Sequence, residues 1–311
     1  MLGPHALRVT LPFVWRRFPY VLTAVATAPR SVPGPFRIGA ATSDRVVVRR
    51  GRVSVIFRRL DARTAVREFR AGRLDEAPVP LGEIAATRAD ARIGAALRTR
   101  RLLGLDVVFF APIAYELRRA YRDTADRVDY AALIPEQPDA SAYGFLGGEQ
   151  GDPALYRRAL KRMSSLPHKL IKFAAPHDPA LEEGARLLYA QWRDMGLGPE
   201  LVSGDVTKPH AALRRIIAVY PQQEAIPAEL VLREELSPRA LLLRALAATQ
   251  QGDDLERLDA ALWRSARAVP IAWVVDARLA SPRLRGWRES ALGDVDYSVV
   301  RSLASSRSRS P

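Results

Sequence analysis

The stretch KLIKFAAPHDPALEEGARLLYAQWRDMGLGPELV, residues 169–202, decides the fold class. It opens with a short apolar run at 169–174, which is typical of a buried strand. Asp178 is followed by proline, which is favoured at the first helical position, and Gly196 follows the last residue that keeps helical spacing. A second apolar pair at 201–202 indicates another strand. The apolar face of the intervening helix is predicted to comprise Leu181, Ala185, Leu188, Trp192 and Met195.

Strand and helix patterns alternate along the rest of the chain as well. Strands are predicted at 45–48, 53–57, 106–110, 216–219 and 271–275. Helices are predicted between Asp61 and Gly72, over 113–128, from Asp152 onward, and over 238–249 and 254–267. Because a chain that alternates strands with helices covers a sheet with helices, the pattern predicts an α/β fold.

Length and composition are those of an ordinary globular protein. The chain has 311 residues, which is enough for two domains, with 48% hydrophobic and 26% charged residues. Its formal net charge of +14 raises the question of nucleic-acid binding. However, all but four of the 48 Lys and Arg residues are arginine, and they are scattered rather than gathered in one run. A nucleic-acid site would need a basic patch interleaved with aromatic residues, which the sequence lacks, so we expect no nucleic-acid partner.

The sequence also lacks the residue sets that catalysis or cofactor binding requires. There are no cysteines, which excludes disulfides, thiol catalysis and cysteine-ligated zinc. It contains no glycine-rich nucleotide-binding motif and no nucleophile elbow, and its acidic pairs fall in first turns of predicted helices, where they complement the helix dipole. The four histidines, none of them at metal-ligand spacing, are His5, His168, His177 and His210. We therefore expect a protein that is not an enzyme and has no cofactor and no metal.

The apolar runs and the two ends of the chain bear on where the protein resides. No apolar run approaches the ~20 residues of a membrane span, so we expect no membrane-spanning helix. Residues 18–28 follow two arginines and end in small residues, as a signal peptide does. Pro12, Pro19 and Thr23 interrupt the apolar run, which favours a folded segment instead. Residues 304–311 are predicted to be a disordered tail.

Two further segments are candidates for binding a ligand. Residues 135–151 form a long loop rich in proline and glycine, and a loop of this length is functional or mobile. The second candidate lies at 216–223, where a strand pattern runs into a Tyr-Pro turn and then into the neutral amides Gln222 and Gln223. Turns that follow buried strands often hold ligands, because the strand fixes them in place.

Several segments, taken in order, resemble family 5 of the solute-binding proteins of ABC transporters, the peptide- and oligopeptide-binding type. The matching segments are Leu11-Pro12-Phe13, PGPFRI at 33–38, FRAGRLD at 69–75, the helix from Leu117 to Arg127, the section from Asp152 to Gly196, and the return strand within 269–287. Each motif is weak by itself. Their common order, over roughly residues 10–300, makes the resemblance moderately specific.

The resemblance implies a type II periplasmic-binding-protein-like fold, in which two lobes are joined by crossover strands. It places the first lobe at 1–108 and 275–311 and the second lobe at 109–274, with crossovers near Phe110 and Trp273. Members of the family normally have a long additional stretch before the first matching segment, so the first lobe is expected to be incomplete. The second lobe is nearly complete and is expected to fold best.

The resemblance also bears on the turn within 216–223. Peptide-binding relatives commonly carry an aspartate where this chain has Val219, and that carboxylate pairs with the α-ammonium of the ligand. Because valine cannot form such a pair, one interpretation is a neutral ligand held by amides and aromatic rings. The other is that Val219 is a core residue and the site is inactive. The candidate ligand-binding residues are Tyr220, Gln222, Gln223, Tyr143 and Trp273.

Three functions stay open on the sequence. The resemblance implies a non-catalytic, extracytoplasmic solute-binding protein that binds a peptide-like or other small polar solute between two lobes and partners an ABC permease. A degenerate or regulatory scaffold in the cytoplasm is the alternative, since Val219 replaces the usual aspartate and there is no cysteine for a lipid anchor. The third is a binder of nucleic acid or an anionic surface. The arginine-rich helices over 113–127 and 238–246 are predicted to be solvated faces rather than permease-docking surfaces.

Overall fold

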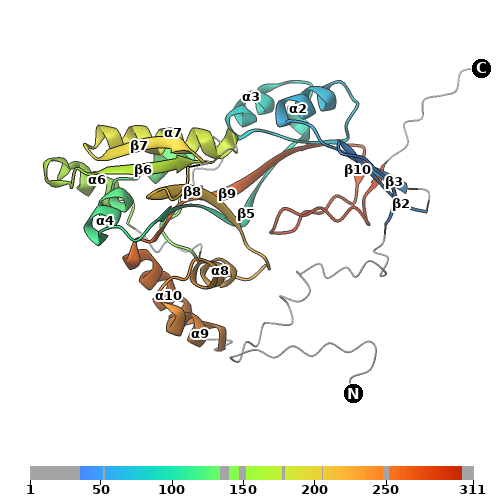
Figure 1. Ribbon diagram of the computed structural model, residues 1–311. Coiled ribbons are helices and arrows are strands. Elements are labelled where there is room, and N and C mark those ends of the chain that lie inside the picture. Colours follow the sequence, from blue (N-terminus) through green and yellow to red (C-terminus); the bar gives the residue numbers. More distant parts are fainter. Residues whose placement is uncertain are drawn as a thin grey trace, which may run out of the picture.

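A mixed six-stranded sheet forms the centre of the computed structural model (Figure 1). The structure describes residues 36–302 except 52, 134–139, 147–151, 177–178, 205 and 248–251. The strands are β1 (Arg37–Ala41), β2 (Arg45–Arg50), β3 (Val53–Arg58), β4 (Glu76–Pro78), β5 (Leu97–Phe110), β6 (Leu170–Ala175), β7 (Gly198–Ser203), β8 (Ala211–Ile217), β9 (Ala268–Ala280), β10 (Leu284–Arg285) and β11 (Arg301–Ser302). The helices are α2 (Ala62–Arg70), α3 (Ile84–Ala89), α4 (Tyr115–Asp123), α5 (Arg127–Ala131), α6 (Leu155–Leu160), α7 (Pro179–Asp194), α8 (Ala225–Arg233), α9 (Arg239–Ala247) and α10 (Gly252–Ser265).

The order of strands in the central sheet is β4-β9-β5-β8-β6-β7. β6 runs parallel to β7 and to β8, whereas β5 runs antiparallel to β8 and to β9. The predicted strand–helix–strand stretch is confirmed, because α7 connects the parallel strands β6 and β7 and its predicted apolar face is buried. Parallel neighbours require a crossover of this length. The α/β class is therefore confirmed.

Helices cover both faces of this sheet, and alternate residues of β5 mark the two sides. Leu105, Val107 and Phe109 belong to a hydrophobic cluster that they share with α8, α9 and α10. Val108 and Phe110 belong to a second cluster, shared with α4, α5 and α7. Since successive side chains of a strand point to opposite faces, the chain forms three layers here. Figure 1 shows α7 on one side of the sheet and α8 on the other.

A third hydrophobic cluster lies at the other end of the sheet, around β4 and the second half of β9. It combines Phe69 of α2 and Ile84 of α3 with Leu279 of β9. The helix α2 begins as the sequence predicts, because the Asp61 carboxylate accepts the backbone N–H of Thr64 at 2.9 Å. This end of the molecule therefore has a core of its own.

The long strands β5 and β9 run through both ends of the sheet. Their register shifts between two pairs, Arg101 opposite Val275 and Leu105 opposite Trp273. Residues 102–104 of β5 therefore stand against one residue of β9, which is a β-bulge. This bulge separates the third cluster from the three-layered part of the molecule.

A separate antiparallel sheet is formed by β1, β2 and β3. The hairpin between the predicted strands at 45–48 and 53–57 turns at Gly51, whose positive φ of 56° favours glycine. Four large apolar side chains of this sheet are exposed: Ile38 at 74%, Ile56 at 48%, Val53 at 44% and Phe57 at 41%. The strands β10 and β11 form a small two-stranded ladder.

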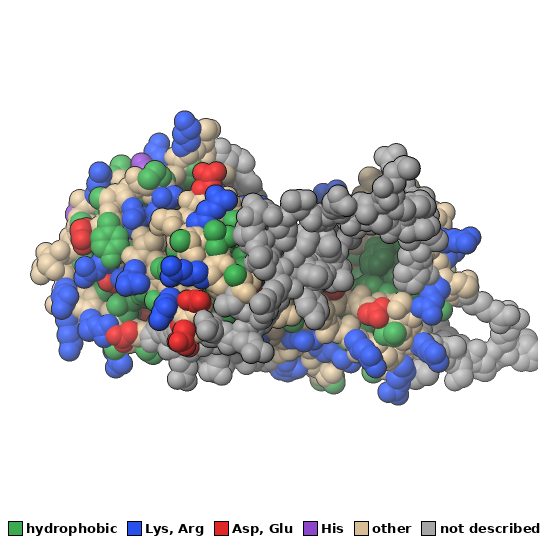
Figure 2. Space-filling model, turned by 90° about the horizontal axis from the view of Figure 1, so that it is seen from below, with side chains coloured by type: hydrophobic (Ala, Val, Ile, Leu, Met, Phe, Trp, Pro, Cys, Tyr) green, Lys and Arg blue, Asp and Glu red, His purple; other side chains and the backbone are tan. Residues whose placement is uncertain are grey.

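The arginines are distributed over the surface rather than gathered at one place. Figure 2 shows basic side chains dispersed over the described part of the face seen from below. Many of them pair locally, such as Arg186 with Glu182 and Arg233 with Glu229, both at 2.7 Å and one helical turn apart. Exposed pairs of this kind contribute well under about 1 kcal/mol each.

The prediction of one continuous helix over 113–128 is wrong, because the structure has two helices there, α4 and α5. At the end of α4 the Thr124 hydroxyl donates to the carbonyl of Ala120 (2.7 Å). The Asp126 carboxylate then accepts backbone N–H groups of the next turn, including that of Val128 (3.0 Å). Short polar side chains compete in this way for backbone groups, so Asp126 starts a new helix.

Three predicted strands are correct in place but wrong in extent, and one of them, predicted at 271–275, is the middle of the longer β9. The strand predicted at 216–219 is β8, which begins at Ala211 and ends before Val219. The strand predicted at 106–110 is the last part of the much longer β5. The N-terminal motifs up to residue 35, His5, His177, most of the 135–151 loop and the 304–311 tail lie outside the described residues.

Candidate functional site

The candidate turn follows β8 and leads into α8. Its first residue, Ala218, donates its backbone N–H to the carbonyl of Leu103 in the bulge of β5 (2.9 Å). Two further backbone bonds close the turn, one from Gln222 to Tyr220 (2.9 Å) and one from Ala225 to Gln222 (3.1 Å). The turn is therefore fixed directly beside the bulge.

The side chains of this turn divide between the core and the solvent. Tyr220 is 1% exposed and belongs to the cluster around α8. Val219 is 53% exposed, so the interpretation of Val219 as a core residue is wrong. Gln222 is half-buried and Gln223 is exposed. The turn presents a valine and neutral amides to the solvent, and the next charged residue, Glu224, is buried.

Trp273 shares a hydrophobic cluster with Tyr220. It lies opposite Leu105, just beyond the bulge, and is 5% exposed. The guanidinium of Arg101 lies over its ring, 4.2 Å from the ring centroid. Because Arg101 is exposed, such a contact contributes only about 0.5–1 kcal/mol.

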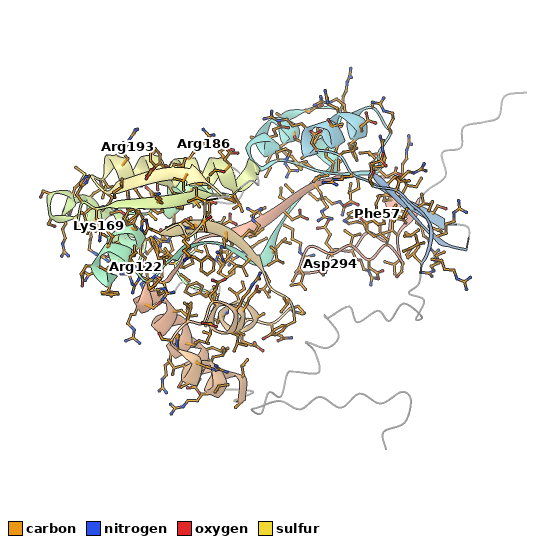
Figure 3. The ribbon with its side chains drawn as sticks, in the orientation of Figure 1. Phe57, Arg122, Lys169, Arg186, Arg193 and Asp294 are labelled. Carbon is orange, nitrogen blue, oxygen red and sulfur yellow. The ribbon has the colours of Figure 1, made fainter. Side chains whose placement is uncertain are left out.

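The segment that links β10 to β11 also contacts the bulge, which the sequence does not predict. The backbone N–H of Leu103 donates to the carbonyl of Ala291 (2.8 Å), and Arg100 Nη1 donates to the carbonyl of Glu289. Figure 3 labels Asp294 near the tip of this segment. A single bulge residue, Leu103, therefore holds the β8 turn through its carbonyl and this segment through its N–H.

The sequence does carry one signal for the bulge. Gly104 interrupts the apolar run of β5, and an isolated glycine within a strand suggests a bulge or a close approach of backbones. A Cβ at this position would lie 2.6 Å from Ile217 Cδ1 and 2.8 Å from the carbonyl oxygen of Ile216. Glycine is thus required where β8 passes the bulge.

Tyr143 makes its contacts elsewhere. Its loop is attached to β9, where the backbone N–H of Ala142 donates to the carbonyl of Ile271 (3.0 Å). The ring of Tyr143 lies 5.3 Å from the guanidinium of Arg127, and burial raises the pKa of its phenol. The structure therefore brings Tyr220 and Trp273 into one cluster beside the amides, and places Tyr143 against Arg127.

Asp259 of α10 holds the Tyr143 loop and makes stability depend on pH. Its carboxylate accepts the backbone N–H of Phe145 (2.9 Å), and the residue is 2% exposed. Burial raises the pKa of this carboxyl to about 6. The folded protein therefore binds the proton more tightly than the unfolded chain. The resulting stabilisation is fully present below about pH 4 and is lost as the pH rises through about 6.

We expect Asp259→Asn to raise the free energy of unfolding by about 2 kcal/mol at about pH 7.5 and to change it little at about pH 4. The amide oxygen can still accept the Phe145 N–H, while the cost of a buried charge is removed. Urea unfolding at the two pH values measures the difference. Asp253→Asn, in the exposed first turn of the same helix, is the matched control. Equal effects of Asp259→Asn at both pH values would contradict this prediction.

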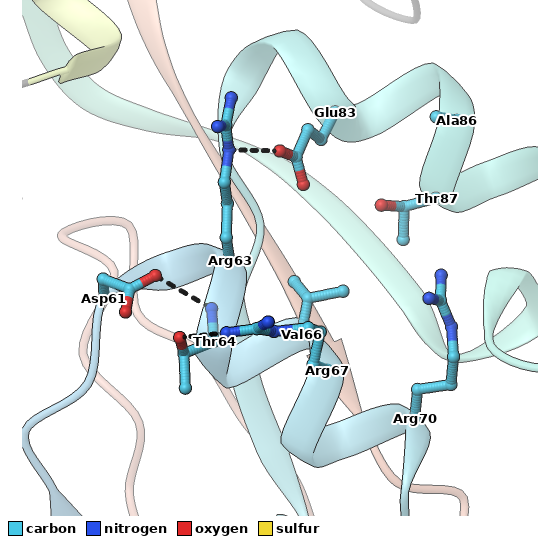
Figure 4. Close-up of a pocket in the computed structure, with 9 residues that line it drawn as sticks. All are labelled: Asp61, Arg63, Thr64, Val66, Arg67, Arg70, Glu83, Ala86 and Thr87. Carbon is cyan, nitrogen blue, oxygen red and sulfur yellow. Dashed lines mark hydrogen bonds and ion pairs between the residues drawn. The ribbon is translucent and has the colours of Figure 1, made fainter.

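Two cavities lie away from the β8 turn. One, of about 510 Å³, lies between α2 and α3. Arg63, Arg67 and Arg70 line it and share one face of α2, because they follow at helical spacing. Figure 4 shows Arg63 pointing to Glu83, with which it pairs at 2.8 Å. The other cavity, of about 730 Å³, lies among α4, α6 and α10.

Two kinds of feature are absent from the part of the chain that the structure describes. Among those residues, no group of His, Asp and Glu side chains has the arrangement of a metal site. No helix within the same ranges is long and apolar enough to cross a membrane.

Neither a protein family model nor a curated protein matches this sequence. Solved structures do match. Haemophilus influenzae OppA, solved with the peptide RPPGFSPFR, superposes with a TM-score of 0.71 at 15% identity, over 86% of this chain and 64% of that one. The Escherichia coli murein tripeptide binding protein MppA superposes with a TM-score of 0.71 at 13% identity, over 94% of this chain and 72% of that one. An ABC transporter substrate-binding protein from Sinorhizobium meliloti superposes with a TM-score of 0.59 at 16% identity, over 87% of this chain and 68% of that one.

The chain has the fold of the peptide-binding proteins. The resemblance that the sequence motifs indicate is therefore confirmed at the level of the fold. Identities of this size establish the fold alone, and the chain spans 64% of the length of the OppA chain that it matches. What it binds, and with which partner, follows as a proposal.

Proposed function

We propose that this chain is a non-catalytic solute-binding protein of an ABC transporter, which binds a peptide-like or other small polar solute between two lobes. The observation that carries the proposal is the bulge at 102–104, where Leu103 joins the β8 turn to the segment between β10 and β11. A ligand held between these two segments would bias the angle between the two ends of the sheet. Closure about a few strand residues is the motion that such binding proteins use.

The proposed lobes follow the two groups of hydrophobic clusters. The three-layered lobe begins at Leu105 rather than at residue 109, because Leu105, Val107 and Val108 already belong to its two clusters, and it extends to residue 274. The described residues before the bulge and after residue 274 belong to the lobe around α2 and β4. We place the first crossover at the bulge, earlier in β5 than Phe110, because the register with β9 shifts there. The second crossover stays at Trp273, whose ring carries the Arg101 guanidinium.

The ligand contacts that we propose are those of the β8 turn. The amides of Gln222 and Gln223 supply neutral donors and acceptors, and Val219 supplies an apolar surface. Tyr220 and Trp273 support the turn from within the core. An extracytoplasmic location and an ABC permease as partner are proposed on the same likeness, since the Sinorhizobium meliloti protein is an ABC transporter substrate-binding protein.

Thermal unfolding with and without ligand pools tests the proposal. The purified chain is heated alone, with a pool of short peptides, and with a pool of sugars, while tryptophan fluorescence is followed. A ligand at 100 times its Kd stabilises the folded state by about 2.7 kcal/mol. A transition that moves upward with one pool supports the proposal and identifies the ligand class. A cooperative transition that moves with neither pool would overturn it in favour of the scaffold alternative.

We expect Val219→Asp to strengthen the binding of peptides with a free N-terminus by about tenfold, or ~1.4 kcal/mol. Val219 is exposed, so the new carboxylate would stand in the position from which related binders are expected to hold the α-ammonium. Calorimetric titration with one peptide and its N-acetylated form measures the gain. Val219→Asn is the matched control, because it has the same shape and no charge. An equal gain for the acetylated peptide would argue against an ammonium contact.

A further inference from the structure

The cavity of about 730 Å³ among α4, α6 and α10 is unusually rich in arginine. Its basic lining residues are Arg119, Arg122, Arg158, Arg162 and Arg264. Two carboxylates, those of Glu116 and Asp123, line it as well. One third of the lining is therefore arginine, which is well above the already high share in the whole chain.

Two of these arginines form one wall of the cavity and have close carboxylate partners. Arg122 is 7% exposed, and its Nε donates to the Asp123 carboxylate (2.7 Å) while its Nη1 donates to the carbonyl of Trp263 (3.0 Å). Its guanidinium lies over the Trp263 ring, 4.9 Å from the centroid. Arg158 pairs with Asp152, which neutralises it. The contacts of Arg122 fix its side chain without any ligand, whereas the exposed pair of Arg158 with Asp152 is weak.

The other three arginines have only weak carboxylate partners, or none among the described residues. Among the described residues, Arg162 and Arg264 are exposed and have no carboxylate partner, and Arg264 Nε donates only to the carbonyl of Ala260 in its own helix (3.2 Å). Arg119 is shared between Glu116 (3.7 Å) and Asp123 (3.5 Å). Pairs at these distances on an exposed helix are weak and exchange readily.

A further positive charge lies behind the wall. Arg127 is 1% exposed, and its guanidinium lies 5.2 Å from the Trp263 ring centroid. Its hydrogen bonds go to carbonyl groups, including that of Pro270 (2.9 Å). Burial lowers the pKa of Arg127 to about 10, so the residue still carries its charge at neutral pH. A buried charge behind a concave wall strengthens the potential inside the cavity.

From this arrangement we infer that the cavity binds a compact multivalent oxyanion, a phosphate or pyrophosphate group. Guanidinium groups match the oxygens of phosphate in pairs. Arg162 and Arg264 have no carboxylate partner among the described residues, and the cavity lining holds five arginines against two carboxylates. The cavity is concave and of the size of a small-molecule site, which fits a small anion better than a nucleic-acid strand. The site does not include the β8 turn, so a failure of the proposed solute to bind would not count against anion binding here.

Calorimetric titration with inorganic pyrophosphate tests this inference. The full chain is compared with the double variant Arg162→Gln, Arg264→Gln, whose substitutions lie on exposed positions and leave the core intact. We expect the double variant to bind pyrophosphate roughly a hundredfold more weakly, about tenfold for each lost charged hydrogen bond. Titration with inorganic phosphate and with citrate distinguishes a phosphate group from any multivalent anion. Binding of citrate as tight as that of pyrophosphate would overturn the assignment of phosphate.

The matched control is Arg186→Gln, Arg193→Gln, which removes the same charge from α7. Figure 3 labels both residues, and neither lines the cavity. We expect this control to bind pyrophosphate within about twofold of the parent chain. An equal loss in both double variants would mean that net charge alone attracts the anion, and would overturn the inference. DNA retention that the two variants weaken equally, without measurable pyrophosphate binding, would also overturn it.

Discussion

Asp106→Asn is expected to lower the free energy of unfolding by about 3 kcal/mol or more. Asp106 is 1% exposed in β5, where its carboxylate accepts hydrogen bonds from the Arg215 guanidinium (2.8 and 3.0 Å) and from the Tyr130 hydroxyl (3.1 Å). Two of these three hydrogen bonds come from a guanidinium, and hydrogen bonds between charged groups are the strong ones. Removing one partner of a buried ion pair typically costs about 3–5 kcal/mol, because the other charge loses its counter-ion.

Urea unfolding followed by circular dichroism measures this loss. Asp194→Asn is the matched control, since its carboxylate is 72% exposed and pairs with Arg193 at 3.5 Å. We expect this control to change the free energy of unfolding by less than about 1 kcal/mol. A loss for Asp106→Asn as small as that of the control would mean that β5 and β8 are held by their backbone ladder and apolar contacts alone.

The part of the fold that local spacing determines was predictable from the sequence. The prediction of α7 is correct because Leu181, Leu188 and Trp192 recur at helical spacing between a proline and a glycine. The first half of β5 was missed, because its charged residues Arg98, Arg100 and Arg101 hide a strand that forms only through pairing with β9. Pairing between distant segments leaves no local pattern in a single strand.

The candidate site was predictable to a smaller extent. The turn after β8 was found from its proline and polar residues, but the orientation of Val219 was not. The alternation of a strand predicts which side chains are buried only while the strand continues, and β8 ends at Ile217. The bulge at 102–104, which joins the turn to the segment after β10, depends on a register shift that the sequence signals only through Gly104.

Trp192→Ala is expected to lower the free energy of unfolding by about 4 kcal/mol. Trp192 is 1% exposed, and its Nε1 donates to the carbonyl of Tyr121 (3.1 Å). Its ring packs edge-on against those of Tyr121 (5.0 Å) and Phe173 (4.9 Å), which joins α7 to α4 and to β6. The substitution removes both ring contacts, leaves a cavity and leaves the Tyr121 carbonyl without this donor.

Trp192→Phe is expected to cost about half as much, because a smaller ring keeps part of the packing and loses the hydrogen bond. Leu232→Ala, at a position that is 41% exposed, is the control and should cost less than about 1 kcal/mol. Urea unfolding measures the three values.

Hydrogen exchange of Trp192→Ala then shows which parts of the chain lose stability. Since β5 and β9 pass through both ends of the sheet, protection around Leu279 should fall together with that of α7. Unchanged protection around Leu279 would mean that the bulge divides the chain into two units that unfold separately.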